Sequence, residues 1–237
     1  TLGCKVGQSE VSRPYAISSA PKAALGRKIS LTVKNCGFFS GYLFDHASVG
    51  DEFTVGDPSG DFCYEPVKDA EHVVALAGGS GITPFYSMAQ AGADGTDNYA
   101  LTIFYGARTA EDLIFKKELD ALVSDKIKVI YVLSDEQKEG FEHGFIGAGL
   151  IKKYVSGDYT VMMCGPQAMY AFAEKELASL GLPLRRIKKE ANCVCSRDVK
   201  AEKYELTVHI GFETFKIPAD SRETILTSME RAGLNVP

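Results

Sequence analysis

Residues 73–86 read VVALAGGSGITPFY, an apolar run that breaks into a glycine-rich turn and resumes in a helix-like pattern. An uninterrupted apolar run is typical of a parallel strand buried on both faces. Glycines directly after such a strand let the backbone approach a phosphate, which then lies at the positive end of the next helix. The stretch therefore predicts a strand, a phosphate-binding turn and a helix, although glycine turns without a ligand are also common.

The composition is that of an ordinary soluble protein, with 237 residues and a hydrophobic fraction of 45%. A net charge of -5 disfavours a general nucleic-acid or anionic-membrane binder, because such proteins use basic surfaces. No apolar run approaches the roughly 20 residues that a membrane-spanning helix needs, and no signal peptide opens the chain. We therefore expect a cytoplasmic protein with no nucleic-acid partner and no membrane span.

Six cysteines are scattered without the spacing of a disulfide scaffold or a zinc site. Cys193 and Cys195 are too close together for the usual zinc pair. We expect reduced thiols and no metal site among these residues.

Short strands separated by turns are expected in residues 1–66. Ile29–Lys34 alternates with period two, and Phe53–Val55 reads as another strand. Between them, Gly37–Phe44 predicts a turn and a short helix capped by Ser40. The pattern predicts an antiparallel β-barrel.

Residues 67–195 alternate strands with longer amphipathic segments, which predicts a parallel sheet with crossover helices. The later predicted elements are strands at Tyr99–Tyr105, Ile127–Leu133 and Tyr159–Cys164, and helices at Asp112–Leu122, Leu150–Tyr154 and Gln167–Leu180. Ligands of such a sheet bind beyond the carboxyl ends of its strands.

Residues 196–237 begin with a charged linker over 196–203. Tyr204–Ile210 and Glu213–Pro218 then alternate as a hairpin, and Thr224–Ala232 is helical. Because a hairpin and one helix bury too little apolar surface to be a domain, we expect this segment to be the beginning of one.

Four motifs, taken in order, resemble those of the ferredoxin-NADP reductase superfamily of flavin- and nicotinamide-dependent enzymes: Arg13–Ala16, Gly37–Ser40, Gly78–Pro84 and Cys164–Pro166. The tail resembles the start of a plant-type 2Fe-2S ferredoxin domain. The implied fold class is α/β with all-β: a partial antiparallel flavin-binding β-barrel over 1–66, a parallel-sheet, Rossmann-like NAD(P)H-binding domain over 67–195, and a truncated β-grasp ferredoxin-like segment over 196–237.

The resemblance implies that Arg13 binds the flavin pyrophosphate and that Tyr15 packs on the isoalloxazine ring. Paired guanidinium donors suit a phosphate, and a phenol ring offers a flat face for stacking. The amides of Phe39 and Ser40 would bind the same pyrophosphate at a helix start. Ala16 stands where the family has a hydroxyl near the reactive edge of the flavin.

For the nicotinamide half, the resemblance assigns the phosphate turn to Gly79 and Gly81 and places Thr83 beside the nicotinamide. It places Cys164 near the nicotinamide C4 and Glu190 near the flavin, as the catalytic positions. The other implied cofactor-binding residues are Pro14, Ser18, Gly37, Pro84, Arg108, Asp135, Gly165 and Pro166.

Asp135 lies in an acidic loop where NADP-dependent relatives present basic groups to the 2′-phosphate, so NADH is the expected donor. The implied function is an NAD(P)H-dependent flavoprotein reductase that passes hydride to FAD and then single electrons, through a 2Fe-2S centre, to an acceptor such as a ferredoxin or an oxygenase. The cluster ligands are expected beyond Pro237, and further barrel strands before Arg13, so the sequence reads as an internal fragment. Two alternatives are an electron-transfer subunit of the dihydroorotate dehydrogenase type and a nucleotide-binding regulatory module without catalysis.

Overall fold

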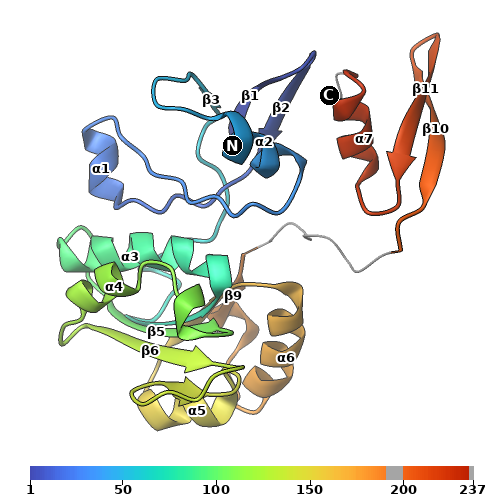
Figure 1. Ribbon diagram of the computed structural model, residues 1–237. Helices are drawn as coiled ribbons and strands as arrows, with labels where there is room; N and C mark the ends of the chain where they lie inside the picture. The colour runs from blue at the N-terminus through green and yellow to red at the C-terminus, as the bar shows by residue number, and fades with distance from the viewer. Residues whose placement is uncertain (191–199, 235–237) are drawn as a thin grey trace. The chain divides into compact units, whose positions relative to one another are not determined.

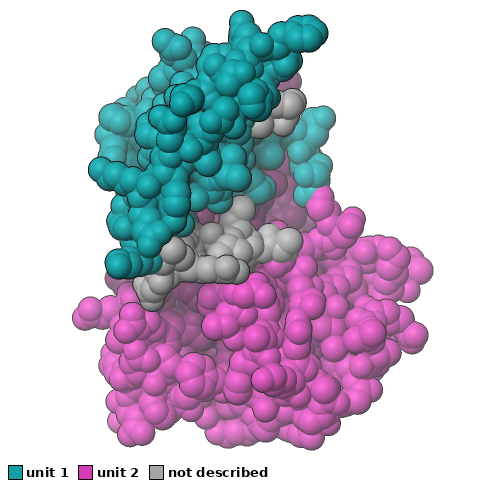
Figure 2. All heavy atoms as spheres, turned by 90° about the vertical axis from the view of Figure 1, so that its right-hand side faces the viewer, with its two compact units in different colours: residues 1–15, 33–59, 194–237 teal, residues 16–32, 60–193 magenta. Residues whose placement is uncertain are grey.

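The computed structural model describes residues 1–190 and 200–234. The chain divides into two compact units, which Figure 2 colours separately. Unit 1 contains residues 1–15, 33–59 and 194–237, and unit 2 contains residues 16–32 and 60–193. The expected linker over 196–203 and the Cys193–Cys195 pair lie largely outside the described residues.

Unit 2 is built on a six-stranded, all-parallel sheet in the order β7-β6-β5-β4-β8-β9. The predicted parallel, Rossmann-like architecture is therefore confirmed, with two short edge strands that the sequence pattern did not indicate. The strands are β4 (His72–Gly78), β5 (Ala100–Ala107), β6 (Ile127–Leu133), β7 (Glu142–His143), β8 (Thr160–Cys164) and β9 (Ile187–Lys189).

Helices cover both faces of this sheet, as Figure 1 shows. Alternate residues of β4 enter two different cores: Val73 and Ala75 join one cluster, whereas Val74 and Leu76 join the other. The first core includes residues of α3 and α4, and the second includes residues of α5 and α6. These helices are α3 (Thr83–Ala93), α4 (Lys116–Leu122), α5 (Ala148–Tyr154) and α6 (Gln167–Ala178). Burial on both faces explains why β4 is an unbroken apolar run.

The first part of unit 1 is a small antiparallel sheet in the order β2-β1-β3 with one helix. A core of Val11, Phe39 and Leu43 joins the sheet to that helix. The expected antiparallel β-structure is thus present. Its elements are β1 (Leu2–Val6), β2 (Ser9–Arg13), α2 (Phe38–His46) and β3 (Thr54–Val55).

Two local predictions are wrong, and the predicted Ser40 cap is present with a different geometry. Ile29–Lys34 is not a strand: only Leu31 forms an isolated bridge, to Ile17, and the short helix α1 (Pro21–Leu25) precedes it. The Ser18 amide donates to the Ser30 carbonyl, and side-chain bonds take the place of further pairing: the Ser18 hydroxyl donates to the same carbonyl and the Ser19 hydroxyl accepts from the Ser30 amide.

The helix expected over Asp112–Leu122 is interrupted at Phe115, which has a φ of 58°. A 3₁₀ turn over Ala110–Asp112 precedes α4. In α2, Gly37 is the N-cap and Ser40 is the third helical residue. The Ser40 hydroxyl reaches back to accept from the Cys36 and Gly37 amides, so it caps from inside the helix.

The second part of unit 1 is the predicted hairpin and helix. The hairpin turn holds Gly211 at a φ of +60°, a region that favours glycine. Helix α7 packs on strand β11 and also contacts β2. The elements are β10 (Lys203–Ile210), β11 (Glu213–Asp220) and α7 (Ile225–Arg231).

A buried ion pair fastens the segment that leads into β4 to the edge strand β9. The Lys188 ammonium donates to the Asp69 carboxylate at 2.7 Å and to the Cys63 carbonyl at 2.9 Å. The Asp69 side chain is 0% exposed and also accepts from the Glu65 amide. Removing one partner of a buried pair leaves an uncompensated charge, which costs more than the pair itself contributes.

We therefore expect Lys188→Ala to lower the free energy of unfolding by about 3 kcal/mol. The matched control is Lys189→Ala, whose exposed pair with Glu174 contributes less than about 1 kcal/mol. Urea unfolding followed by circular dichroism measures both. A loss of unfolding free energy for Lys188→Ala no larger than that for Lys189→Ala would contradict a stabilising role of the buried ion pair. The double variant Lys188→Met with Asp69→Asn should recover part of the loss, because it leaves no unpaired buried charge.

Candidate functional site

The glycine turn meets the end of β8 at the carboxyl edge of the parallel sheet. Residues Gly79–Ile82 form a single 3₁₀ turn between β4 and α3. A Cβ added to Gly81 would lie 2.0 Å from the Cys164 carbonyl oxygen, and one added to Gly78 would lie 2.8 Å from the side chain of Pro166. The structure thus brings together the Gly78–Pro84 and Cys164–Pro166 motifs.

The two phosphate-turn glycines have different roles in this geometry. Gly81 is needed because the Cys164 carbonyl occupies the space of a side chain. Gly79 has a φ of +54°, a conformation in which a residue with a side chain would be strained. No atom lies within 4 Å of the position that its Cβ would take, so the backbone there is open to a ligand. An open backbone turn before a helix is the cradle that a dinucleotide phosphate requires. The turn fits that group.

Thr83 and Pro84 begin helix α3. The Thr83 hydroxyl donates to the Ser80 carbonyl at 3.1 Å, and the side chain is largely buried. Pro84 stands in the first turn, where a missing amide hydrogen costs nothing. Both residues fix the direction in which the helix leaves the turn.

Helix α3 also holds the segment that follows Tyr15. Ser87 donates to the Ser19 carbonyl at 2.7 Å, and Gln90 donates to the Ser18 carbonyl at 2.9 Å. The Ser18 hydroxyl donates to the Ser30 carbonyl and accepts from Thr32. Residues 16–19, which include Ala16, are therefore anchored to the helix that starts at the glycine turn.

Gly165, which follows Cys164, is linked to Glu190 through Tyr170. The Tyr170 hydroxyl accepts from the Gly165 amide at 3.2 Å and donates to the Glu190 carbonyl at 2.7 Å. The Glu190 amide donates to the Met163 carbonyl, so Glu190 is held at the end of β8. Burial raises the pKa of the Glu190 carboxyl above its ordinary value. No feature of the sequence singled out Tyr170, which occupies one apolar position of an amphipathic helix.

Arg108 and Asp135 form an ion pair beyond the ends of β5 and β6. The Arg108 Nε donates to an Asp135 oxygen at 3.0 Å, and the Asp135 amide donates to the Arg108 carbonyl. The Ser134 hydroxyl and then Arg108 lower the pKa of the Asp135 carboxyl. Among the residues that the sequence singled out, Arg108 is the exposed guanidinium at this edge. Its charge is already paired with the Asp135 carboxylate.

An exposed aromatic pair also lies at this edge, beyond the ends of β7 and β8. Phe145 is 73% exposed, and its ring centroid lies 5.7 Å from that of Phe172 on α6. Such a pair offers a flat apolar face on which a planar ring can stack. The sequence analysis did not single out Phe145, although an aromatic residue between Gly144 and Ile146 beyond a strand end was a usable signal.

Unit 1 holds the other predicted positions. The Arg13 guanidinium already binds a carboxylate through two nitrogens, so its donor set fits an anion with two oxygens, such as a phosphate. The Tyr15 ring lies 6.5 Å from that of Phe39, beside Pro14 in the chain. The first amides of α2, at Phe39 and Ser40, precede the first helical hydrogen bond, from Gly41 to Gly37. These groups fit a pyrophosphate and a flat ring.

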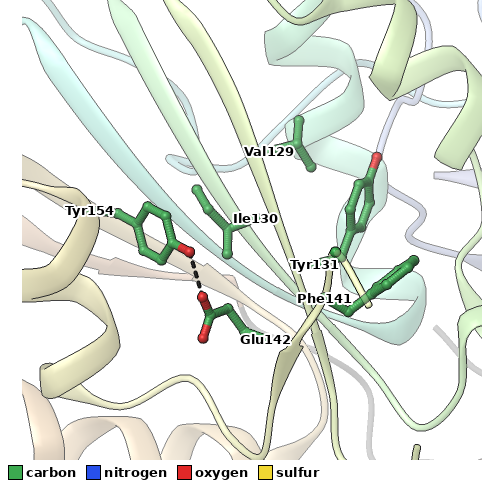
Figure 3. Close-up of a pocket in the computed structure, with 7 residues that line it drawn as sticks. Val129, Ile130, Tyr131, Phe141, Glu142 and Tyr154 are labelled. Carbon is green, nitrogen blue, oxygen red and sulfur yellow. Dashed lines mark hydrogen bonds between the residues drawn. The ribbon is translucent and has the colours of Figure 1, made fainter. Parts of the chain in front are cut away.

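Two surface hollows lie apart from these positions. One of about 400 Å³ opens beside β6, where the Tyr154 hydroxyl donates to Glu142 near Phe141, as Figure 3 shows. The other, of about 620 Å³, lies at the amino ends of the strands, next to His72 and Asn98. The residues that line these two hollows are not predicted site residues.

The comparisons with known proteins agree with this geometry. Residues 75–175 match the family described as the oxidoreductase NAD-binding domain. NADH-cytochrome b5 reductase 1 of Candida glabrata is 30% identical over 194 residues, which are 77% of this chain and 67% of that protein. The glycine betaine monooxygenase reductase subunit of Chromohalobacter salexigens is 31% identical over 87% of this chain and 58% of its own length. This chain therefore spans only about three fifths to two thirds of those relatives.

Among solved structures, the flavohem-like FAD/NAD binding domain of nitric oxide dioxygenase from Vibrio cholerae superposes with a TM-score of 0.68. It is 25% identical, and the match covers 80% of this chain and 82% of that domain. The superposition spans more than the parallel sheet alone.

We expect Gly81→Ala to lower the free energy of unfolding by about 3 kcal/mol, because the new methyl group must displace the end of β8. Gly149→Ala in α5 is the control: its Cβ meets nothing within 4 Å, so it should stabilise by about 0.5–1 kcal/mol. Denaturant titration compares the two. Equal free energies of unfolding for the two variants would contradict a close contact between Gly81 and the Cys164 carbonyl.

Glu190→Gln should raise the melting temperature at pH 7 by a few degrees, because the charged carboxylate is desolvated in the folded state. A carboxyl whose pKa is raised in the folded state makes its full contribution to the stability of the protein below its ordinary pKa. That contribution is lost as the pH rises through the folded-state pKa. The gain should therefore vanish near pH 4. The exposed Glu174→Gln is the control, and a pH-independent gain would contradict this explanation.

Proposed function

Because the chain belongs to the ferredoxin-NADP reductase superfamily of NAD(P)H-dependent flavoprotein reductases, we propose that it is the reductase core of an NADH-dependent flavoprotein. The residues of the site would hold a nicotinamide cofactor and FAD, which together would supply hydride-transfer chemistry. The observation that carries the proposal is the meeting of the glycine turn with the Cys164–Pro166 turn at the carboxyl edge of the sheet. Parallel sheets bind nucleotides at that edge.

The role of these residues is to bind and orient. We propose that Gly79 and Gly81 with Thr83 and Pro84 receive the dinucleotide, and that Phe145 and Phe172 stack a planar ring of it. The nicotinamide ring would lie beside Cys164, Gly165 and Pro166, and the flavin would lie near Glu190. Arg13, Tyr15, Gly37, Phe39 and Ser40 hold the flavin phosphates and ring. These assignments rest on the donor sets described above.

For the whole protein, we propose an electron-acceptor protein as partner, such as a ferredoxin or an oxygenase, and a 2Fe-2S centre. The support is the hairpin and helix of β10, β11 and α7, which resembles the start of a ferredoxin domain. The similar reductase subunit of glycine betaine monooxygenase is named as the reductase of an oxygenase. We place the boundaries at residues 1–66, 67–195 and 196–237. In the described part of the chain, no helix has the length and apolarity to span a membrane.

One experiment tests this proposal directly. The protein is incubated with FAD, freed of excess flavin and titrated with NADH under anaerobic conditions while its absorbance spectrum is recorded. We expect a bound-flavin spectrum that bleaches with NADH. A protein that retains flavin but does not bleach is not a reductase, and flavin released by heat should be FAD and not FMN.

Asp135→Asn should shift the coenzyme preference toward NADPH. The change removes the carboxylate that would repel a 2′-phosphate and releases Arg108 from its ion pair. We expect kcat/KM for NADPH to rise about tenfold, equivalent to ~1.4 kcal/mol. Asp125→Asn, an exposed change of equal charge at the amino end of β6, is the control. Similar effects of both variants would mean that net charge, not the ion pair, sets the preference.

A further inference from the structure

Helix α7 supplies a carboxylate to the arginine that ends β2. Arg13 Nη1 donates to Glu230 Oε1 at 2.8 Å, and Arg13 Nη2 donates to Glu230 Oε2 at 2.5 Å. The Ser9 hydroxyl, at the other end of β2, donates to the Glu230 carbonyl at 2.8 Å. The helix is thus fastened along the length of the strand, by residues 217 and 221 positions apart in the chain.

The geometry of this contact is that of bidentate anion recognition. Two guanidinium nitrogens meet two carboxylate oxygens, which is also how arginine holds two oxygens of a phosphate. The Arg13 Nη1 donates in addition to the Ser12 carbonyl. The Glu230 side chain is only 7% exposed and that of Arg13 23%. The carboxylate therefore stands where a phosphate would have to bind.

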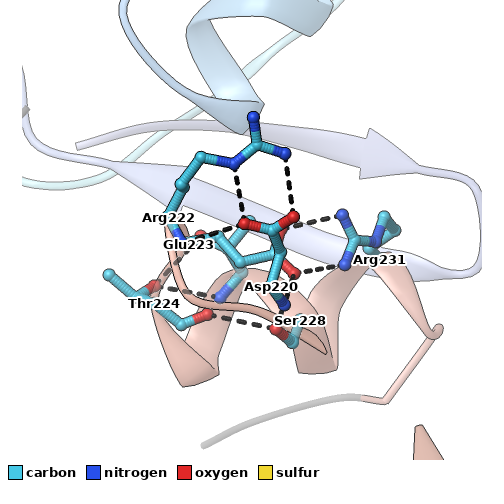
Figure 4. Close-up of polar contacts among 7 residues, drawn as sticks. Asp220, Arg222, Glu223, Thr224, Ser228 and Arg231 are labelled. Carbon is cyan, nitrogen blue, oxygen red and sulfur yellow. Dashed lines mark hydrogen bonds and ion pairs between the residues drawn. The ribbon is translucent and has the colours of Figure 1, made fainter. Parts of the chain in front are cut away.

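The carboxylate comes from a preformed helix. As Figure 4 shows, Glu223 binds Arg231 and Ser228, and Asp220 binds Arg222 through two bonds. The Thr224 hydroxyl caps the helix by accepting from the Thr227 amide. None of these bonds involves Arg13, so the bonds within the hairpin and helix do not depend on the contact with β2.

Local charge makes Arg13 a strong attractor for such a carboxylate. Residues 11–44 contain no Asp or Glu, yet they contain Arg13, Lys22, Arg27, Lys28 and Lys34. The nearest acidic residues along the chain are outside that span, so the counter-charge is brought in by tertiary structure.

We propose that Glu230 and the flavin pyrophosphate compete for Arg13, so that flavin loading releases helix α7 from β2 and docking of α7 opposes loading. The proposal rests on the proposed function, which assigns Arg13 to the flavin phosphates. The Nη1 and Nη2 donors that meet Glu230 form the same two-nitrogen edge that a phosphate would use, so the two occupants exclude each other at that edge. Binding and release are therefore coupled, and each occupant weakens the other by the same factor.

The first test is the affinity for FAD, measured by titration of flavin fluorescence. We expect Glu230→Gln to lower the dissociation constant roughly five- to tenfold, because the competing charge is gone. Glu205→Gln is the matched control: Glu205 lies on the same hairpin in an exposed pair with Lys216, and its loss changes the net charge equally. Equal affinities of wild type and Glu230→Gln, or an equal gain in the control, would overturn the proposal.

The second test follows α7 itself by hydrogen exchange of the amides in Ile225–Arg231. FAD should lower their protection in the wild type, and Glu230→Gln should lower it without FAD. Protection that neither FAD nor the substitution changes would overturn the competition even where FAD binds. Failure of every variant to bind FAD, with α7 still released by Glu230→Gln, would instead locate the error in the proposed flavin site.

Discussion

The close approach of the Gly79–Ile82 turn to the end of β8 is the constraint on which unit 2 depends. β4 and β8 are parallel neighbours, so their carboxyl ends reach the same edge of the sheet together. The Cys164 carbonyl then takes the space of a Gly81 side chain, and Gly165 faces Gly78 in the same way. Gly78, Gly81 and Gly165 are buried by this approach, whereas Gly79 has open space where a side chain would lie, so its backbone is the part of the turn that a ligand can reach.

The helix that begins at this edge, α3, also holds the chain segment that follows Tyr15 by hydrogen bonds. Ser87 and Gln90, on the helix that begins at the glycine turn, bind the Ser19 and Ser18 carbonyls. Because those carbonyls bond to α3, the pairing of this segment with Ile29–Lys34 is limited to the isolated bridge of Ile17 with Leu31. Hydrogen bonding to α3 and to Ser30 thus explains both the absent strand and the grouping of residues 16–32 with unit 2.

Charge distribution links the two ends of unit 1. The carboxylate that Arg13 binds comes from a distant helix, although Glu10 lies on the same strand. An arginine that serves a phosphate must remain able to exchange its partner, and a carboxylate on a helix that can leave is such a partner. A competing contact of this kind would make cofactor loading depend on the state of the C-terminal segment.

The sequence by itself determined the elements whose pattern is local: the strand, glycine turn and helix of residues 73–93, the remaining long strands of the sheet, and the hairpin and helix over 203–231. Apolar periodicity and turn glycines act within a few residues and are readable in one dimension. Only the tertiary structure decided which partner each polar group takes. The pairing of Arg108 with Asp135, the link of Tyr170 to Glu190 and the contact of Arg13 with Glu230 join residues 20 to 217 positions apart. Such contacts depend on how the elements pack, because hydrogen bonds and charges act through space and leave no periodic signal along the chain.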